Sequence, residues 1–228
     1  MTVQDHPLVT VVVPAFNSAE VIESTLASVV GQTLASWECL VVDDGSTDRT
    51  RETVEAWQAR DSRIRLIEQE NAGVGAARNE GIRQARGRYL APLDADDVWA
   101  PGKLEQQVER IEQAGEGCGM VYCWSRRIDR EGRHLWDCYP SEVEGRVLEA
   151  LFVRNFVGNA SVALYRTGLV RELGGYLTRS EEEGAQGCED WDLSLRVLRT
   201  HACAVVRDYL VDYRNVDDCM SRDVDGMA

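Results

Sequence analysis

The stretch at residues 88–99 decides the fold, and it reads Arg-Tyr-Leu-Ala-Pro-Leu-Asp-Ala-Asp-Asp-Val-Trp. Its first half is a short apolar run after Gly87, which predicts a buried strand. Its second half places Asp94, Asp96 and Asp97 within four positions. Carboxylates this close repel one another unless a cation lies among them, and Mg²⁺ or Mn²⁺ takes carboxylate, water and phosphate oxygens. Because ligands of open α/β sheets bind beyond the carboxyl ends of strands, we predict a metal-diphosphate site; an acidic turn that caps a helix is the alternative.

Three further apolar runs precede this stretch and alternate with helical segments. Residues 8–13, 38–42 and 64–67 each predict a short buried strand. We expect Asn17 to cap the first helix, with Glu20 completing a capping box. Repeated strand-helix alternation is typical of an α/β fold, so we predict a mostly parallel, Rossmann-like central sheet with helices on both faces.

The second half of the chain has a less regular pattern. Further strands are expected at residues 120–124, at 160–165 and within 203–213, whereas residues 125–142 allow no assignment. Residues 179–187 are charged and flanked by glycine. We predict that they form a mobile loop that orders over a bound ligand.

Composition limits the classes of function. The chain has 228 residues, of which 44% are hydrophobic, so one large domain with a sizeable core can form. The net charge of −14 and the pI of about 4.7 argue against broad nucleic-acid binding, which needs a basic face. An anionic substrate would need a local cation, and a bound metal ion would supply it.

Cysteine and histidine usage indicates a reducing compartment. The seven cysteines are scattered without a C-x-x-C pair, and the three histidines lack a zinc-type spacing. The N-terminus has no signal-peptide pattern, and no apolar run approaches the roughly 20 residues of a membrane span. We therefore expect a cytoplasmic protein without a transmembrane segment. Peripheral association with the inner face of a membrane is an alternative that the acidic charge does not favour.

Several other nucleotide-binding and phosphatase patterns are missing. No G-x-G-x-x-G follows the first strand, and no Walker lysine loop occurs. Gly73 and Gly75 fit close packing better than a phosphate loop. Val98 stands where a D-x-D-x-T phosphatase would need threonine.

Six sequence motifs, in order and spacing, resemble the family-two glycosyltransferases of the GT-A fold. They are Pro14-Ala15-Phe16-Asn17; Val42-Asp43-Asp44-Gly45-Ser46-Thr47-Asp48; Asn71 with Gly73, Ala77, Arg78, Asn79 and Gly81; Leu93-Asp94-Ala95-Asp96-Asp97; Gly174-Gly175-Tyr176 with Glu189-Asp190-Trp191-Asp192; and Tyr213-Arg214. The resemblance spans about residues 8–214. The Gln-x-x-Arg-Trp motif of processive polysaccharide synthases is missing, which resembles the branch that transfers single sugars.

This resemblance implies a single GT-A domain over residues 1–228. Its nucleotide-sugar-binding half would be about residues 1–99, and its acceptor-binding half about residues 100–228. The implied enzyme is an inverting hexosyltransferase-type glycosyltransferase that depends on Mn²⁺ or Mg²⁺. Its donor would be a nucleotide-diphosphate sugar, most simply UDP-linked, and its acceptor a saccharide or a lipid-linked saccharide. Oligomeric state does not follow from the sequence.

The resemblance also implies where the nucleotide binds. Pro14, Ala15 and Phe16 would line the base and ribose pocket, and Asp44 would accept a hydrogen bond from the base. A carboxylate at a strand end can accept the imide N–H of uracil or thymine. The alternative is that Asp43 and Asp44 only cap the following helix.

The D-x-D stretch would hold the rest of the donor. Asp94 would contact the ribose, and Asp96 would bind the metal ion, with Asp97 as a substitute ligand. Arg78 would support this site, or would only form a surface or structural salt bridge. The metal ion would neutralise the leaving diphosphate where its charge develops.

Catalysis would depend on the acidic pair at the start of a late helix. Asp190 would be the general base that takes the proton of the acceptor hydroxyl, and Glu189 would orient the base or the acceptor. The alternative is that both acids only stabilise a helix N-terminus. Trp124, Trp136 and Tyr139 could stack on an acceptor sugar, although packing explains them as well.

Two other functions stay open. A sugar-nucleotide nucleotidyltransferase can use a similar sheet but needs a glycine-rich loop with arginine after the first strand, and residues 14–17 are not such a loop. A non-catalytic nucleotide-sugar-binding module is disfavoured by the intact D-x-D and Glu189-Asp190 pairs.

Overall fold

The computed structural model describes residues 6–179 and 187–215. Its first half alternates strands and helices. These are β1 (Val9–Ala15), α1 (Ile22–Val30), β2 (Trp37–Asp43), α2 (Thr50–Arg60), β3 (Ile64–Glu68), α3 (Val74–Gln84), β4 (Tyr89–Pro92) and the short β5 (Val98–Trp99). Strands β3, β2, β1 and β4 pair in that order, all parallel. Every residue of β1, β2 and β4 is buried, as expected for strands covered on both faces.

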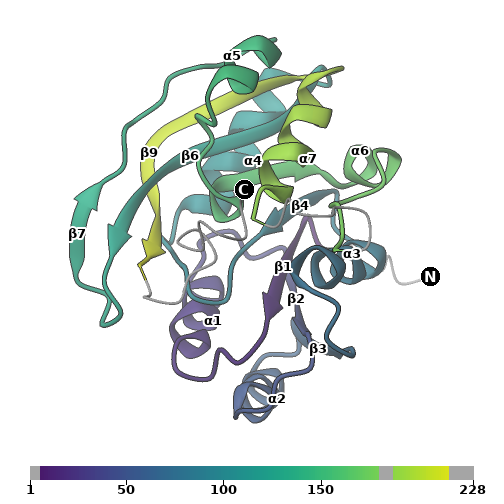
Figure 1. The fold of residues 1–228 in the computed structure, drawn as a ribbon, viewed down its shortest axis with the longest axis vertical. Helices are drawn as coiled ribbons and strands as arrows, with labels where there is room; N and C mark the ends of the chain where they lie inside the picture. The colour runs from purple at the N-terminus through teal and green to yellow at the C-terminus, as the bar shows by residue number, and fades with distance from the viewer. Residues whose placement is uncertain (1–5, 180–186, 216–228) are drawn as a thin grey trace.

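The second half extends the same sheet (Figure 1). Its elements are α4 (Lys103–Ala114), β6 (Cys118–Ile128), β7 (His134–Asp137), α5 (Leu148–Val153), a 3₁₀ turn (Ala160–Val162), β8 (Ala163–Arg166), α6 (Thr167–Glu172), α7 (Glu189–Leu198) and β9 (Ala202–Arg214). Strand β8 is antiparallel to β4 and β6, whereas β6 and β9 are parallel. Strand β5 closes the sheet antiparallel to β9, and β7 pairs with β6.

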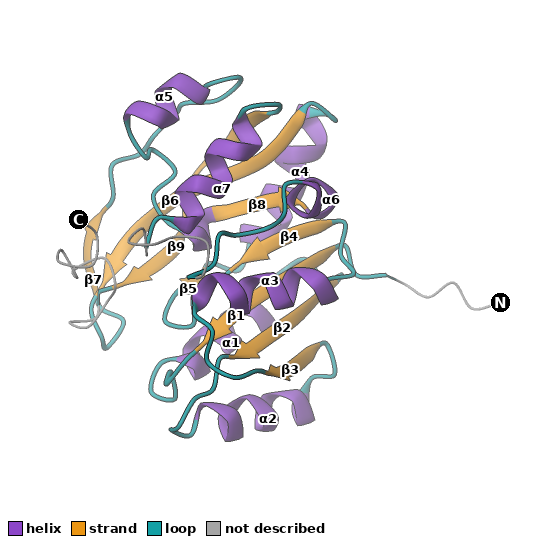
Figure 2. Cartoon of the chain, turned by 45° about the vertical axis from the view of Figure 1, so that its right-hand side comes forward, coloured by secondary structure: helices purple, strands orange, loops and turns teal. Residues whose placement is uncertain are grey.

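Helices cover both faces of this sheet (Figure 2). Helices α1, α2 and α4 lie on one face, and α3, α6 and α7 lie on the other. The predicted α/β sheet with helices on both faces is therefore confirmed. Helix α3 packs very closely: a Cβ on Gly81 would lie 2.4 Å from Val12 Cγ1, and one on Gly75 would lie 2.2 Å from the Leu177 carbonyl oxygen.

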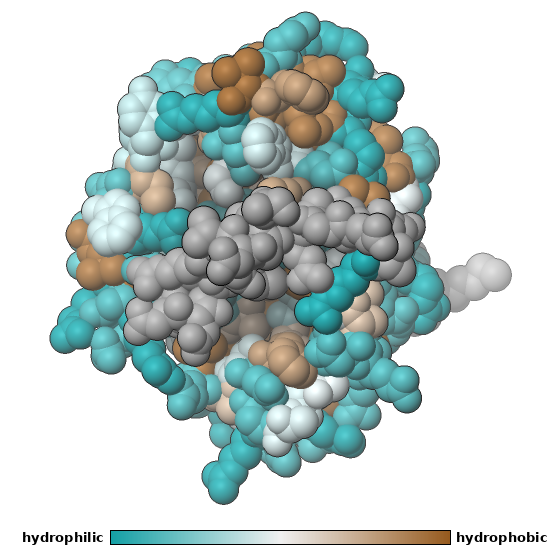
Figure 3. Space-filling view, viewed as in Figure 1, coloured by the Kyte–Doolittle hydropathy of each residue, from teal (hydrophilic) through white to brown (hydrophobic). Residues whose placement is uncertain are grey.

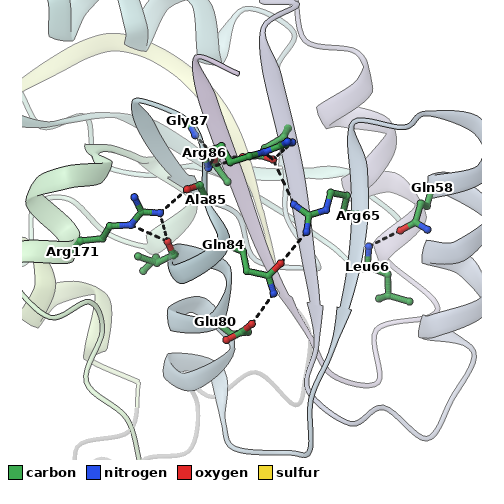
Figure 4. A network of polar contacts seen from close by, with 12 residues as sticks. Gln58, Arg65, Leu66, Glu80, Gln84, Ala85, Arg86, Gly87 and Arg171 are labelled. Carbon is green, nitrogen blue, oxygen red and sulfur yellow. Dashed lines mark hydrogen bonds and ion pairs between the residues drawn. The ribbon is translucent and has the colours of Figure 1, made fainter. Parts of the chain in front are cut away.

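Polar contacts fix the C-terminal end of α3 (Figure 4). Arg171 of α6 donates hydrogen bonds to the carbonyl oxygens of Ile82 and Ala85. Gln84 accepts a hydrogen bond from Arg65 of β3 and donates one to Glu80. These contacts connect the C-terminal end of α3 to the sheet and to α6.

Some sequence expectations differ from the structure. The capping box was wrong: α1 begins at Ile22 without a side-chain cap, because Asn17 has a φ of 49° and its Oδ1 accepts from the backbone N–H of Thr47. Strand β8 begins only at Ala163, after the 3₁₀ turn. The unassigned residues 125–142 continue β6 and return through β7. Most of the predicted mobile loop, residues 180–186, lies outside the described residues.

Candidate active site

A cleft of about 1840 Å³ opens beyond the carboxyl ends of β1, β2 and β4 and is bounded on its other side by β6, α5 and the start of α7. Nine of the ten predicted site residues line it: Pro14, Ala15, Phe16, Asp44, Arg78, Asp94, Asp96, Glu189 and Asp190. Pockets for one drug-sized ligand measure roughly 300–1,000 Å³. The cleft is therefore large enough for two ligands next to each other.

The ends of β1 and β2 form one wall. Pro14 and Ala15 are buried and Phe16 is half exposed to the cleft. The Asp44 carboxylate does not cap α2. It accepts hydrogen bonds from the backbone N–H groups of Ala72 and Gly73, at 2.8 and 2.9 Å. Asp44 thus connects β2 to the turn before α3, and it also lines the cleft.

Arg78 of α3 connects two parts of the chain that lie 111 residues apart. Its guanidinium donates to Asp94 Oδ1 at 2.6 Å and to Glu189 Oε1 at 2.8 Å. Asp94 follows β4, and Glu189 is the first residue of α7. This Arg78 bridge therefore joins the D-x-D turn to the helix that carries Asp190.

The Arg78 bridge lies in a buried environment. Only 3% of Arg78 is exposed, and its guanidinium carbon lies 5.1 Å from the ring centroid of Tyr176. Burial alone would lower the pKa of Arg78, but the neighbouring Asp94, Tyr176 and Glu189 raise it above the usual value. Arg78 is therefore a permanent, buried cation among carboxylates. A surface ion pair is excluded, and the structural ion pair that the sequence left open is present.

Asp96 and Asp97 have different surroundings. Asp96 lines the cleft, and burial together with the charge of Asp94 raises its pKa to about 6. Asp97 is fully buried, where its carboxylate accepts from Ser161 Oγ at 2.5 Å and from the backbone N–H of Arg214 at 3.0 Å. The structure therefore places Asp97 beneath the cleft and not in it, which leaves Asp96 as the candidate ligand for a metal ion.

Asp190 and Glu189 also have separate surroundings. Asp190 is partly buried in the cleft wall, and its Oδ1 accepts from the backbone N–H of Trp191. Burial, and then the charge of Glu189, raises its pKa to about 6 despite the opposing charge of Arg78. Glu189 is buried, and its second oxygen accepts from the Gly187 N–H. Asp190 thus lines the cleft with a raised pKa, whereas Glu189 is ion-paired with Arg78.

The residues around the D-x-D turn include two whose contacts the sequence did not predict. Ser161 Oγ contacts both Asp97 and the backbone N–H of Asp94. Arg214 Nε donates to the carbonyl oxygen of Asp96. No local pattern could have identified Ser161, because it is more than 60 residues from its partners; Arg214 was identified only through the family motif.

The carboxylate oxygens in the cleft suit a metal ion that also binds a diphosphate. The described residues contain no group of three or more His, Cys, Asp or Glu side chains able to hold a metal ion alone. A hard divalent cation needs few protein oxygens when diphosphate and water complete its coordination shell. The raised pKa of Asp96, caused by burial and Asp94, shows a carboxylate that a cation would stabilise in its ionised form. These residues fit Mg²⁺ or Mn²⁺ bound together with a diphosphate.

Comparison with known families agrees with this geometry. The sequence model of glycosyl transferase family 2 matches residues 10–174. The chain belongs to this family. It is therefore a glycosyltransferase, and the predicted enzyme class and family are confirmed.

Two curated relatives of this family-2 glycosyltransferase show the range of similarity. TuaG of Bacillus subtilis (strain 168), named as a glycosyltransferase of teichuronic acid biosynthesis, is 44% identical over 217 residues, which cover 94% of this chain and 82% of TuaG. WfgD of Escherichia coli, named UDP-Glc:alpha-D-GlcNAc-diphosphoundecaprenol beta-1,3-glucosyltransferase, is 44% identical over 108 residues, which cover 47% of this chain and 42% of WfgD.

Solved structures confirm the GT-A fold. TarS 1-349 of S. aureus in complex with UDP-GlcNAc superposes with a TM-score of 0.73 at 20% identity, covering 92% of this chain and 59% of that chain. The mannosyltransferase PcManGT from Pyrobaculum calidifontis, in complex with GDP-Man and Mn²⁺, gives 0.71 at 24% identity, covering 93% and 58%. The family-2 chain thus spans about three fifths of these two proteins.

Within residues 6–179 and 187–215, no helix combines the length and the apolar composition that crossing a bilayer requires.

Proposed function

We propose that this protein is a metal-dependent, inverting glycosyltransferase that moves one sugar from a UDP-linked donor to an acceptor hydroxyl. Polysaccharide or glycoconjugate assembly is the process that we propose it serves. The observation that carries this proposal is the Arg78 bridge, in which one buried cation contacts Asp94 and Glu189 at 2.6 and 2.8 Å. A protein that only bound a nucleotide-sugar would not need a second carboxylate site across the cleft.

The nucleotide-sugar would bind to the half of the chain up to about residue 99, and the acceptor to the half from about residue 100. The ribose would contact Asp94, and the base would lie against Phe16 with Asp44 at its edge. Asp96, together with the donor diphosphate, would hold Mn²⁺ or Mg²⁺, which would supply positive charge to the leaving diphosphate.

Asp190 would accept the proton of the attacking hydroxyl. A base is most effective when its pKa is near the working pH, and burial raises the pKa of Asp190 to about 6. One base and one displacement invert the anomeric centre, whereas retention by double displacement needs a second carboxyl group as nucleophile. Glu189 is occupied by Arg78 and Gly187, which supports a single displacement.

Names of relatives support the choice of donor and process. WfgD is named for a UDP-Glc donor and TuaG for teichuronic acid biosynthesis, and both fit a UDP-linked donor in glycan assembly. In the described part of the chain Cys39, Cys118, Cys123, Cys138 and Cys203 are free thiols. This supports a reducing, cytoplasmic location for the proposed reaction.

The experiment is a panel of nucleotide-sugars, incubated with the protein in Mn²⁺, in Mg²⁺ or in EDTA. We expect hydrolysis of a UDP-sugar without an acceptor, at a rate that EDTA abolishes. Conversion of the nucleotide-sugar to nucleoside triphosphate and sugar 1-phosphate when inorganic diphosphate is added would instead identify the alternative nucleotidyltransferase. Tight UDP-sugar binding with neither hydrolysis nor transfer to any saccharide would identify a binding module and contradict the proposal.

A further inference from the structure

The D-x-D turn, residues 94–97, is held by hydrogen bonds from distant parts of the chain. The carbonyl oxygen of Ala95 accepts from Thr25 Oγ1 at 2.8 Å, and that of Asp96 accepts from Arg214 Nε at 2.8 Å. The Asp96 carboxylate lines the cleft, and among the described residues no other side chain donates a hydrogen bond to it. Its direction is therefore set by the backbone of the turn.

Ser161 makes two further contacts with this turn, from the second half of the chain. Its hydroxyl oxygen accepts from the backbone N–H of Asp94 at 3.1 Å, and its hydroxyl group donates to Asp97 Oδ2 at 2.5 Å. A serine hydroxyl can donate one hydrogen bond and accept others at the same time. The other Asp97 oxygen accepts from the backbone N–H of Arg214 at 3.0 Å. Ser161 thus holds the residues on both ends of the turn, with Asp96 between them.

The 3₁₀ turn that carries Ser161 is itself held by buried side chains. Trp99 Nε1 donates to the Ser161 carbonyl oxygen at 3.0 Å, and Gln107 Nε2 donates to that of Val162 at 2.8 Å. Gln107 Oε1 accepts in turn from Lys103 Nζ, which lies 3.9 Å from the Trp99 ring centroid. A buried and connected polar network of this kind makes a site rigid. It therefore limits how far the Ser161 hydroxyl can move.

This 3₁₀ turn is buried, unlike other parts of the second half of the chain. Ser161 is fully buried and does not line the cleft. The apolar side chains that this half exposes lie elsewhere, and Figure 3 shows brown and pale side chains over α5 at the top and over β7 at the left. Ser161 can therefore affect a ligand only through the groups that it touches, which belong to Asp94 and Asp97.

Loss of the Ser161 hydroxyl would leave two groups short of a partner. They are the backbone N–H of Asp94 and one oxygen of the buried Asp97. A buried polar group without a partner is unfavourable, so the turn would shift until other atoms or water satisfied both groups. The Asp96 carboxylate would move with the backbone. A binding group needs to be held to within about 0.5 Å of its productive position.

From these contacts we propose that Ser161 is a positioning residue for the metal ion and the donor diphosphate, and that it acts through the D-x-D turn on the Asp96 carboxylate. The proposal rests on the proposed function, in which Asp96 binds Mn²⁺ or Mg²⁺ together with the diphosphate. The alternative is that Ser161 only stabilises the fold. A positioning residue changes the part of donor affinity that the metal ion supplies, and its effect requires Asp96.

The test measures UDP binding by calorimetry in EDTA and in Mn²⁺. The dissociation constant in EDTA divided by that in Mn²⁺ gives the metal gain, which is the factor by which the metal ion tightens binding. Loss of an outer partner of a metal ligand typically weakens metal binding by about 10- to 100-fold. Because Ser161 acts through the backbone, we expect Ser161→Ala to lower the metal gain by at least about fivefold. A purely structural loss would weaken binding equally in both buffers.

A double variant tests whether the effect passes through Asp96. Two residues that act through one group are not additive. In the Asp96→Asn background, Ser161→Ala should therefore lower the metal gain by less than about twofold.

Ser194→Ala is the matched control. Ser194 is also a buried serine with two contacts: its hydroxyl lies 3.0 Å from Tyr165 Oη and donates to the carbonyl oxygen of Asp190 at 2.9 Å. It lies on α7 and makes no contact with the D-x-D turn. Its replacement should leave the metal gain within about twofold of that of the parent.

Trp99→Phe decides the question if Ser161→Ala does not fold. It removes the indole N–H that holds the Ser161 carbonyl group, and Trp99 does not line the cleft. We expect a metal gain lowered by at least about twofold, because the same turn is loosened from its buried side.

The outcomes separate this inference from the proposed function. If the parent shows a metal gain that Ser161→Ala retains, only the inference is wrong; where Ser161→Ala does not fold, the same holds for Trp99→Phe. An equal loss with and without Asp96 would also contradict the inference, because Ser161 would then act elsewhere. If the parent binds UDP equally in Mn²⁺ and in EDTA, the proposed metal dependence is wrong and the inference is lost with it.

Discussion

The two halves of the sheet differ in regularity. The parallel ladders among β1, β2, β3 and β4 run without a register shift. The β6–β9 ladder shifts register at three places between Cys118 and Ser125. Bulges of this kind bend strands and redirect side chains. The first half therefore forms a regular sheet edge on one side of the cleft, and the second half forms a curved surface on the other side.

Exposure differs in the same way. The strands β1, β2 and β4 are buried throughout, while every residue of β7 is exposed. A regular, buried sheet holds strand-end groups in fixed positions, and an exposed hairpin is free to vary in sequence. We propose that the first half fixes donor chemistry and the second half acceptor choice, with the Arg78 bridge between them.

Substitution of Asp190, on the acceptor side of the Arg78 bridge, should have the largest effect on the transfer rate. Asp190→Asn keeps the size of the side chain but removes its ability to take a proton. We expect the transfer rate to fall by a factor of about 10² to 10⁴. The matched control is Asp192→Asn, which removes an acid from the same first turn of α7 where Asp192 pairs with Arg196. If Asp190→Asn transfers sugar at a rate within a few-fold of that of the parent, Asp190 is not the base and only stabilises the start of α7.

The bridge itself comes next. Arg78→Gln leaves Asp94 and the buried Glu189 without their cation, and breaking a buried pair costs about 3–5 kcal/mol. Because Asp94 is partly exposed, we expect a loss of about 3 kcal/mol in the free energy of unfolding, measured in urea. Arg83→Gln, which removes an exposed pair with Glu80 on the same helix, should cost under about 0.5 kcal/mol. Equal losses for the two variants would show that the halves are not joined through Arg78.

The pH dependence of kcat/KM tests the surroundings of Asp190. The pKa of Asp190 is raised to about 6 by burial and by Glu189, and only the ionised form can act as base. Activity should therefore be constant above pH 6 and fall about tenfold per pH unit below it. A profile at saturating Mn²⁺ that stays flat down to pH 4 would contradict this assignment.

The smallest expected effect concerns a lysine behind the acceptor wall. Lys103 is fully buried, with Nζ 2.7 Å from Gln107 Oε1 and 3.9 Å from the Trp99 ring centroid. Burial lowers its pKa to about 8. The unfolded chain therefore binds a proton at Lys103 more readily than the folded chain does. The free energy of unfolding should fall as the pH falls from about 10 to 8. Lys103→Met should remove this dependence and raise the free energy of unfolding at pH 7 by about 1 kcal/mol; an unchanged pH dependence would refute it.

Predictability from sequence follows the same division. Residues 8–13, 38–42 and 64–67 gave the parallel strands correctly, because continuous apolar runs are typical of strands buried on both faces. Residues 125–142 did not predict a secondary structure. Strand β7 is an exposed edge strand, so its residues lack the alternation of apolar and polar side chains that indicates a strand. Nine of ten site residues reached the cleft, since strand ends meet at one edge of a parallel sheet. Asp97 did not, because sequence alone does not reveal that Ser161 and Arg214 enclose it.

The division of roles between Asp96 and Asp190 is the central claim, and donor affinity tests it most directly. Calorimetry measures the binding of UDP with Mn²⁺ to the parent, to Asp96→Asn and to Asp190→Asn. We predict that Asp190→Asn binds UDP as tightly as the parent. Asp96→Asn should bind at least about tenfold more weakly, a difference of about 1.4 kcal/mol. Equal affinities for all three proteins, or a loss confined to Asp190→Asn, would contradict the account.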